Sequence, residues 1–297
     1  MNNIIKKGYR NLIETNVLHN LIMTKSPNLR ILNTTWYLPT STNNAQIEVF
    51  EKRIPSSFYF DIDKVIDTKS QFPHMLPTTD DFTAFMKEYR IRTTDQIICY
   101  DNVGVYTSPR VWWMLSSFGC QNVKVLNGGF PKWLKENRPV DSKFNTTYLP
   151  ISEDKHDSYN YSLNNQQVVN YPNVCKLSKL IVNKQTQSQL VDARLNNRFN
   201  GIVPEPRPNV RRGHIPGAKN ITFQDVLSED GTTYLSLEKI KQLGVEKGID
   251  TKYPIVFYCG SGVTACVPYL PFLELGATCS IYDGSWSEYG SFPEPEK

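Results

Sequence analysis

The feature that most limits how this chain can fold is an internal repeat, because each copy must form a similar structural unit. Four segments of the first half return in the same order in the second half. In both halves an Ile-Pro pair precedes a short apolar run, and Ile54 to Tyr100 is nearly the same separation as Ile215 to Tyr258. The matched pairs are RILNTTWYL (30–38) with LVDARL (190–195), RIPSSFYFDI (53–62) with GHIPGAKNITF (213–223), QIICYDNVGVYTSPRVWWM (96–114) with PIVFYCGSGVTACVPYL (254–270), and VKVLNGGFPKW (123–133) with CSIYDGSWSEY (279–289).

Each copy has the pattern of a parallel α/β unit. Short apolar runs that suit buried strands (QIICY, VKVL, PIVFYC and CSIYD) alternate with stretches of helical period. Between Thr79 and Tyr89, apolar residues recur at intervals of three and four behind a Thr/Asp start, which predicts a capped helix. SLEKIKQL (236–243) predicts a similar helix in the second copy. We therefore expect an α/β chain with two tandem domains, each a parallel sheet flanked by helices.

A polar stretch rich in Asn, Ser and Tyr, roughly residues 144–172, separates the copies and predicts a linker. The 297 residues are enough for two hydrophobic cores, so we expect domains at about 1–150 and 165–297. Residues 1–11 are basic but lack the Arg and Ser enrichment of a transit peptide, and we expect them to be solvated.

Charge and cysteine usage exclude several classes of protein. The 33 basic and 29 acidic residues are scattered, with no run that could follow a phosphate backbone, so nucleic acid is not an expected partner. No stretch approaches the ~20 apolar residues of a membrane span, and the N-terminus lacks a secretory signal, so we expect an intracellular protein without a membrane anchor. The six cysteines show no CxxC pair and no paired Cys/His spacing, so we expect no metal, cofactor or disulfide framework.

The third repeated segment carries the chemistry. In each copy an apolar strand runs into a turn that contains Gly and then into a helix, and the backbone N–H groups of such a turn favour a bound anion. Cys259 begins the second turn, where a thiolate is favoured and nucleophilic. Asp101 begins the first turn and cannot accept a sulfur atom. One loop is therefore expected to be chemically competent and the other degenerate.

The loop CGSGVTA (259–265) resembles the active-site loop of the mercaptopyruvate-using sulfurtransferases of the two-domain rhodanese family. The resemblance implies two rhodanese-like domains, the first catalytically degenerate, and sulfur transfer from 3-mercaptopyruvate through a persulfide on Cys259. It extends from about residue 29 to residue 289 and includes FDID (60–63), HMLP (74–77), PRVWWM (109–114), GHIPGAKN (213–220) and DGSW (283–286).

The resemblance also implies the roles of other residues. The enolate that leaves the substrate needs a proton, and Ser261 is paired with His74 and Asp63 as a set that orients and moves protons. Arg198 and Arg207, in RFNGIVPEPR (198–207), are expected to hold the substrate carboxylate, which planar Arg forks bind well. The rest of the substrate-binding loop is expected to be Gly260, Gly262, Val263 and Thr264.

Three features qualify this site. The sequence has Val203 and Pro204 where relatives tend to carry an acid and Pro. Pro268 and Pro271 follow the loop and are expected to strain or kink the next helix. We expect Arg194 to form a structural ion pair with Asp192 and not to contact the substrate.

The residues of the loop bear on three alternative functions. A thiosulfate sulfurtransferase remains an alternative, although a dianionic donor favours cationic side chains in the loop and Gly260 and Ser261 are neutral. A dual-specificity phosphatase needs a longer loop closed by Arg, and Ala265 and Cys266 stand there. A non-enzymatic rhodanese-like binding module is disfavoured by the intact Cys259. The sulfur acceptor stays open among thioredoxin, glutathione and cyanide, and the location is expected to be the cytoplasm, with the mitochondrion as the alternative.

Overall fold

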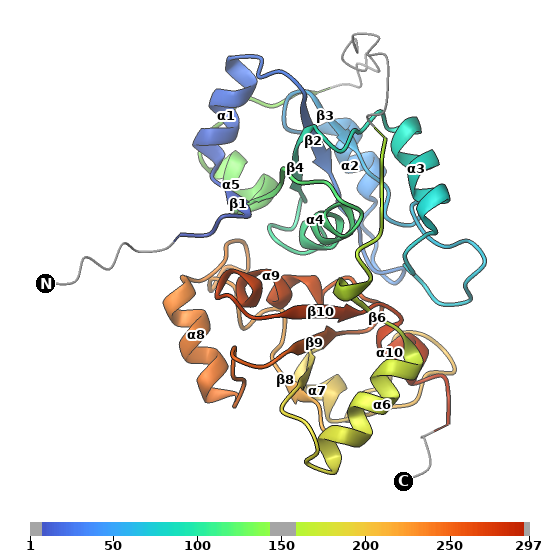
Figure 1. Cartoon of the computed structure of the whole chain (residues 1–297). Coiled ribbons are helices and arrows are strands. Elements are labelled where there is room, and N and C mark those ends of the chain that lie inside the picture. The colour runs from blue at the N-terminus through green and yellow to red at the C-terminus, as the bar shows by residue number, and fades with distance from the viewer. Residues whose placement is uncertain (1–7, 143–158, 294–297) are drawn as a thin grey trace, which may run out of the picture. The chain divides into compact units, whose positions relative to one another are not determined.

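The computed structural model describes residues 8–142 and 159–293 (Figure 1). In the first half, the elements in chain order are β1 (Leu12–Ile13), α1 (Thr15–Met23), β2 (Leu29–Asn33), α2 (Ala45–Glu51), β3 (Ser57–Tyr59), α3 (Thr79–Glu88), β4 (Gln96–Tyr100), α4 (Ser108–Ser117), β5 (Val123–Leu126) and α5 (Gly129–Lys135). The second half contains the short 3-10 helix η1 (Asn165–Gln167), β6 (Val168–Val169), α6 (Tyr171–Val182), β7 (Gln189–Asp192), α7 (Asn196–Phe199), β8 (Lys219–Asn220), α8 (Leu237–Glu246), β9 (Ile255–Tyr258), α9 (Cys266–Glu274), β10 (Cys279–Tyr282) and α10 (Ser285–Tyr289).

Among the described residues the strands form two five-stranded sheets in which all neighbours are parallel. The strand order is β1-β5-β4-β2-β3 in the first sheet and β6-β10-β9-β7-β8 in the second. Each strand of one sheet thus has a counterpart at the same position of the other. The duplicated sequence builds one topology twice, and the predicted α/β class is confirmed.

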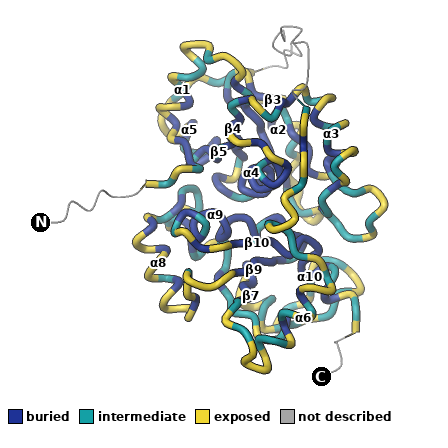
Figure 2. Tube along the Cα trace, viewed as in Figure 1, coloured by how far each residue is buried: buried dark blue, intermediate teal, exposed yellow. Residues whose placement is uncertain are grey.

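Both sheets are buried between helices, as expected from the apolar runs that form their strands (Figure 2). In the second sheet, α6 and α10 cover one face, where Val174 and Trp286 pack with Val256 and Tyr258. On the other face, α9 packs on β9 and β10, and α8 packs on α9. The predicted capped helices are present as α3 and α8, whose N-caps Thr78 and Ser236 accept backbone N–H groups three residues ahead.

One tertiary contact repeats the sequence duplication in detail. The hydroxyl of Tyr100, at the end of β4, accepts the backbone N–H of Ile54 at 3.2 Å. The hydroxyl of Tyr258, at the end of β9, accepts the backbone N–H of Ile215 at 3.1 Å. Each tyrosine therefore ties the segment that begins with Ile-Pro to the strand that leads into the anion-binding turn.

The described chain groups into two compact units by its internal contacts. Of the described residues, one unit comprises 12–67, 77–142 and 159–163, and the other comprises 8–11, 68–76 and 164–293. The second unit thus includes two segments from the first half of the sequence. The domain limits at 1–150 and 165–297 stay a prediction, and residues 143–158 of the expected linker lie outside the described residues.

Two expectations about irregular segments were wrong. The end of the polar stretch expected to be a linker contains β6 and the start of α6, and β6 pairs with β10. A two-residue strand is too short to give a periodic pattern. Of the N-terminal residues expected to be solvated, Tyr9 donates its hydroxyl to the carbonyl of Leu235, and the backbone of Asn11 donates to Glu274 at 2.7 Å. Residues 1–7 lie outside the described chain.

No helix within residues 8–142 and 159–293 is both long enough and apolar enough to span a membrane.

Candidate active site

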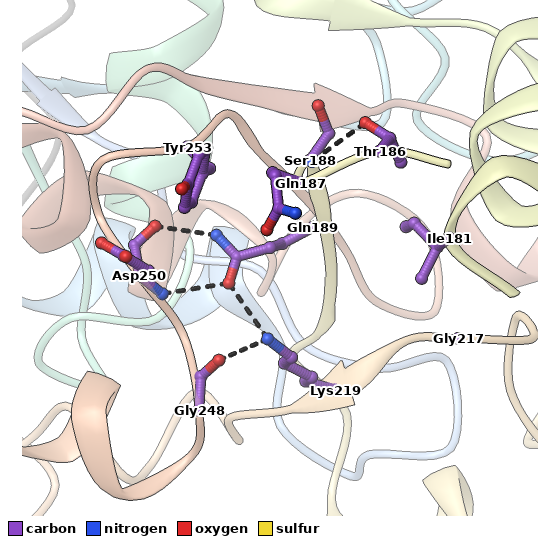
Figure 3. A pocket seen from close by; sticks show the side chains of 10 residues that line it. All are labelled: Ile181, Thr186, Gln187, Ser188, Gln189, Gly217, Lys219, Gly248, Asp250 and Tyr253. Atoms are coloured by element: carbon purple, nitrogen blue, oxygen red, sulfur yellow. Dashed lines mark hydrogen bonds between the residues drawn. The ribbon is translucent and has the colours of Figure 1, made fainter. Parts of the chain in front are cut away.

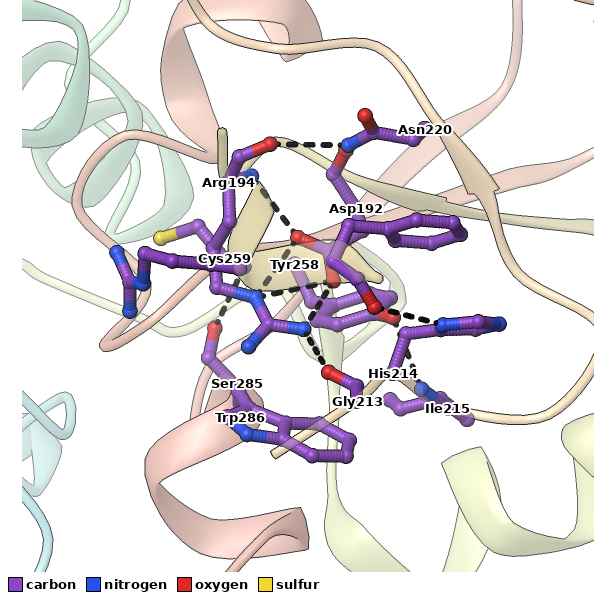
Figure 4. A network of polar contacts seen from close by, with 12 residues as sticks. Asp192, Arg194, Gly213, His214, Ile215, Asn220, Tyr258, Cys259, Ser285 and Trp286 are labelled. Atoms are coloured by element: carbon purple, nitrogen blue, oxygen red, sulfur yellow. Dashed lines mark hydrogen bonds and ion pairs between the residues drawn. The ribbon is translucent and has the colours of Figure 1, made fainter. Parts of the chain in front are cut away.

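Cys259 directly follows β9, at the carboxyl edge of the second sheet, and is buried. Its backbone N–H donates to Oγ of Ser285 at 3.2 Å, and its carbonyl accepts the N–H of Trp286 at 3.0 Å (Figure 4). The carbonyl of Gly260 accepts both the N–H and the hydroxyl of Ser287. The DGSW segment after β10 therefore fixes the backbone of the Cys259 loop (residues 259–265).

The Asp101 loop (residues 101–107) of the first sheet already holds an anion, which is its own carboxylate. Asp101 is fully buried, and its two oxygens accept five backbone N–H groups and one hydroxyl at 2.7–3.1 Å. The donors are the backbone N–H groups of Val103, Gly104, Tyr106, Thr107 and Ser108 and the hydroxyl of Ser108. This loop binds an anion as the sequence predicts, and the anion is covalently built in.

The positions of the Cys259 loop can be matched with those of the Asp101 loop by counting from the first residue of each. Counting from Cys259, the positions of Val103, Tyr106 and Thr107 are taken by Ser261, Thr264 and Ala265. The backbone N–H groups of these three residues have no hydrogen-bond acceptor within the described part of the chain. Unlike the Asp101 loop, this loop presents donors that its own first side chain does not use.

His74 and Ser261 lie together, as the sequence predicts. Nδ1 of His74 and Oγ of Ser261 are hydrogen-bonded at 3.0 Å, and both residues are buried. Both belong to the unit that carries Cys259, because residues 68–76 group with the second sheet. Asp63 belongs to the other unit, where its carboxylate accepts the indole N–H of Trp36 at 2.9 Å. Its pairing with His74 stays a prediction.

Arg198, on α7, lies against the Cys259 loop. A β-carbon placed on Gly260 would lie 3.0 Å from Nη2 of Arg198. The guanidinium donates through Nη2 and Nε to Glu205, whose side chain is nearly inaccessible. The residues of the loop are neutral, as the sequence indicates, but α7 brings the cation of Arg198 against it. Glu205 neutralises the charge of this guanidinium and fixes its orientation.

Arg194 is the centre of a buried polar network (Figure 4). Its guanidinium donates to Asp192 through Nε and Nη2, to Glu205 at 2.7 Å and to the carbonyl of Gly213 at 2.7 Å. It also stacks 4.6 Å from the ring of Trp286. The predicted structural ion pair with Asp192 is confirmed, and Arg194 shares Glu205 with Arg198.

The remaining predicted residues lie in two places. Gly262, Val263 and Thr264 continue the Cys259 loop, where Gly262 has a φ of 76° that suits glycine. Arg207 is partly exposed, two residues beyond Glu205. Glu205 and Asp283 were not predicted from the sequence, although Glu205 lies in RFNGIVPEPR and Asp283 in DGSW. No sequence pattern marks these two carboxylates, so only their contacts in the folded chain identify them.

The helix after the loop, α9, runs through both prolines without interruption. Pro268 is its third residue, where the missing N–H is not needed, and Pro271 lies in its interior.

Four of the other five thiols are poorly suited to nucleophilic chemistry. Burial raises the pKa of Cys120 to about 12 and raises the pKa of Cys99 and Cys279 well above the usual range of a thiol. Burial also raises the pKa of Cys175. These thiols stay protonated at neutral pH, because their thiolates would be desolvated.

A polar cavity of about 280 Å³ lies at the opposite edge of the second sheet (Figure 3). It is lined by Ile181, Thr186, Gln187, Ser188, Gln189, Gly217, Lys219, Gly248, Asp250 and Tyr253. Gln189 begins β7, whereas Cys259 follows the end of β9, so the cavity contains none of the predicted site residues. Lys219 donates to Gln189 and to the carbonyl of Gly248 just beyond α8, which is the contact of a helix-capping lysine.

Comparison with known proteins supports the assignment of the fold. The family model "Rhodanese-like domain" matches residues 43–136 and 175–291. The chain is 38% identical over 273 residues to 3-mercaptopyruvate sulfurtransferase of Mus musculus, covering 90% of this chain and 87% of the relative. It is 34% identical over 280 residues to thiosulfate/3-mercaptopyruvate sulfurtransferase 1, mitochondrial, of Arabidopsis thaliana, covering 91% and 74%.

Among solved structures, the crystal structure of SseA from Escherichia coli, described as having the rhodanese fold of 3-mercaptopyruvate sulfotransferases, superposes with a TM-score of 0.78 at 29% identity. The match covers 93% of this chain and 98% of SseA. The first matched range contains β3, β4 and β5 of the first sheet, and the second contains β7 to β10 of the second sheet. The chain therefore belongs to the rhodanese family, as a member with two rhodanese-like domains in tandem.

Proposed function

We propose that this chain is a 3-mercaptopyruvate sulfurtransferase that carries the transferred sulfur as a persulfide on Cys259. The observation that carries the proposal is the contrast between the two loops. The carboxylate oxygens of Asp101 stand two bonds from Cβ, as the outer sulfur of a cysteine persulfide does. The bound carboxylate of Asp101 is therefore our analogue of a persulfide anion on Cys259. We propose that the N–H groups of the Cys259 loop, which are without acceptors among the described residues, hold that anion.

The first half-reaction forms one bond and breaks another. The thiolate of Cys259 attacks the sulfur of mercaptopyruvate, an S–S bond forms, and the C–S bond breaks with its electron pair going to carbon as the enolate of pyruvate. Carbon is thereby reduced and the transferred sulfur is oxidised to the sulfane level. The persulfide then gives up a proton, and its anion is stabilised by the N–H groups of the loop.

The enolate takes up a proton to become pyruvate, so the proton lost by the substrate thiol is balanced by the one gained at carbon. The hydrogen-bonded pair of Ser261 and His74 supports a role in moving this proton. We keep Asp63 in the proposal as the partner that would orient His74. With that partner, His74 and Ser261 would act as a proton relay for the enolate.

The substrate carboxylate is assigned to Arg198 and Arg207. Nη2 and Nε of Arg198 bind Glu205, which leaves Nη1 of the planar fork for a second carboxylate. The contact of Arg198 with Gly260 supports an anchor next to the sulfur that is attacked. Gly262, Val263 and Thr264 would line the same side of the loop.

In the second half-reaction an acceptor thiolate attacks the outer sulfur, and Cys259 leaves as the thiolate. We propose a thiol such as thioredoxin or glutathione as the acceptor, with cyanide as a chemical substitute. We place the reaction in the cytoplasm, with the mitochondrion as the alternative, which the name of the Arabidopsis relative favours.

Thiosulfate is the second candidate donor, because the same relative is named for both compounds. The guanidinium of Arg198 against Gly260 also favours a dianionic donor more than the loop sequence suggested. Its pairing with Glu205 works in the opposite direction, since the pair carries no net charge.

The deciding experiment measures pyruvate release from mercaptopyruvate by the purified chain with a dithiol reductant. We expect multiple turnovers, together with a cyanide-labile sulfur on the protein when the reductant is left out. Absence of both pyruvate and labile sulfur would contradict the proposal.

A further inference from the structure

His74 reaches the Cys259 loop on a segment that comes from the first half of the sequence, residues 68–76. We infer that Asp283 is a positioning residue that anchors this segment and thereby keeps His74 in contact with Ser261. The inference rests on the proposed function, because the position of His74 affects turnover only if Cys259 transfers sulfur.

The anchor includes a short hydrogen bond to the backbone. Oδ2 of Asp283 accepts the backbone N–H of Leu76 at 2.7 Å, and Asp283 is buried. A bond from an N–H to a carboxylate is about twice as strong as one to a neutral acceptor. Leu76 is two residues beyond His74, so the bond fixes the backbone next to the imidazole.

Asp283 and Cys259 leave the same edge of the sheet. Asp283 follows β10 directly, Cys259 follows β9 directly, and these two strands are parallel neighbours. The anchor is therefore attached to the same rigid scaffold as the nucleophile. A shift of this scaffold would move both together.

The backbone at His74 needs such an anchor. Its φ is 61°, in the left-handed region that residues other than glycine avoid, and a conformation of this kind persists only where its surroundings fix it. The contacts that fix it include Leu76 to Asp283, His74 to Ser261, and the edge-on packing of Phe72 on Phe292 with ring centroids 6.1 Å apart.

The fold by itself does not require a carboxylate at this position. In the first sheet the counterpart of Asp283 is Asn127. The backbone N–H of Asn127 donates to the carbonyl of Ile13, and the backbone N–H of Asp283 donates to the carbonyl of Val169. The side chain of Asn127 instead donates to Glu14 at 2.9 Å. The backbone role is thus repeated in both halves, whereas the carboxylate that receives Leu76 belongs to the half that contains Cys259.

The test compares Asp283→Asn with wild type in two independent measurements. Hydrogen exchange of the backbone amides in residues 68–76 should accelerate by roughly tenfold, because the neutral acceptor is weaker. The kcat for pyruvate release from mercaptopyruvate should fall by a similar factor of about ten with KM little changed, whereas turnover of thiosulfate, whose leaving sulfite needs no proton at carbon, should change by less than about twofold. Asp283→Glu should restore part of both losses.

Two further variants separate anchoring from damage to the fold. Glu288→Gln removes a nearby acid that receives the hydroxyl of Tyr282 and not the 68–76 segment, so it should leave exchange in that segment unchanged. Replacing the Leu76 peptide bond by an ester removes the donor N–H and keeps every side chain, so it should reproduce the effects of Asp283→Asn.

Each failure has its own signature. Unchanged exchange in both Asp283→Asn and the ester variant would overturn the anchoring, whatever the activity. An equal loss of turnover with both donors would overturn the link to His74. If the wild type released no pyruvate while the variants still exchanged faster, the proposed function would fall and the anchoring would stand.

Discussion

Nδ1 of His74 and Oγ of Ser261 are hydrogen-bonded at 3.0 Å, although 187 positions of sequence separate the two residues. The contact brings a titratable ring to the loop that begins with Cys259. In the proposed function, Cys259 is the nucleophile and this side-chain pair handles the proton.

Cys259→Ser should abolish turnover, whereas Cys266→Ser should leave it within about threefold of wild type. The reason is that only Cys259 begins a loop with backbone donors that its own first side chain does not use, while burial raises the pKa of Cys99, Cys120 and Cys279. Mass spectrometry after treatment with mercaptopyruvate should find one added sulfur on the peptide that contains Cys259. Its presence on the Cys99 or Cys266 peptide would contradict the assignment.

His74→Ala and Ser261→Ala should each lower kcat for mercaptopyruvate by roughly 10²-fold, the size expected when a proton-transfer group is removed. The double variant should be little worse than either single variant, because the two side chains act as one hydrogen-bonded pair. Rapid-quench measurement of pyruvate release gives the three rates. Fully multiplicative losses would show that the two residues act independently.

Arg198→Ala and Arg207→Ala should each raise KM for mercaptopyruvate by about tenfold or more, since a hydrogen bond to a charged group contributes about 1.5–3 kcal/mol. Steady-state kinetics with mercaptopyruvate and with thiosulfate should separate the carboxylate contact from a general loss of activity. Arg212→Ala, which removes an exposed arginine just beyond this segment, is the matched control. An unchanged KM in both test variants would place the carboxylate site elsewhere.

The wild type should use mercaptopyruvate at least about tenfold more efficiently than thiosulfate in kcat/KM, equivalent to roughly 1.4 kcal/mol. The Arg198–Glu205 pair carries no net charge, and Ser261 suits protonation of an enolate more than release of sulfite. Gly260→Arg combined with Ser261→Lys should erase this preference, because a side chain at 260 must displace Arg198 and bring positive charge to the sulfur. Equal use of both donors by the wild type would show that loop charge does not set the preference.

Asp101→Ala should destabilise the first unit by at least about 3 kcal/mol, the cost typical of removing one partner from a buried charged cluster. Five N–H groups and one hydroxyl would lose their acceptor. Sulfate or phosphate should recover part of the lost melting temperature by binding the vacated loop, with Asp230→Ala as an exposed control. The folded variant should keep its turnover, and insensitivity of its melting temperature to sulfate would contradict the reading of Asp101 as a built-in anion.

The sequence by itself determined the repeated α/β architecture and pointed to Cys259 as the proposed nucleophile. Strand and helix periods, the Ile-Pro pairs and the spacing to Tyr100 and Tyr258 are local or nearly local signals, so they predict two copies of one topology. The Cys259 loop is also local, because its donors are the backbone of a few consecutive residues. The same holds for the predicted degeneracy of the Asp101 loop.

Only the tertiary structure decided how side chains from distant segments are brought to this loop. The family resemblance pairs His74 with Ser261, and the two meet because residues 68–76 group with the second sheet, which no periodicity in those residues indicates. Glu205 and Asp283 are ordinary acids in the sequence, and their importance follows from burial next to Arg198 and Leu76. An acid that is removed from water must find a hydrogen-bond or charged partner. The packing of strands and loops that are far apart along the chain decides which residue that partner is.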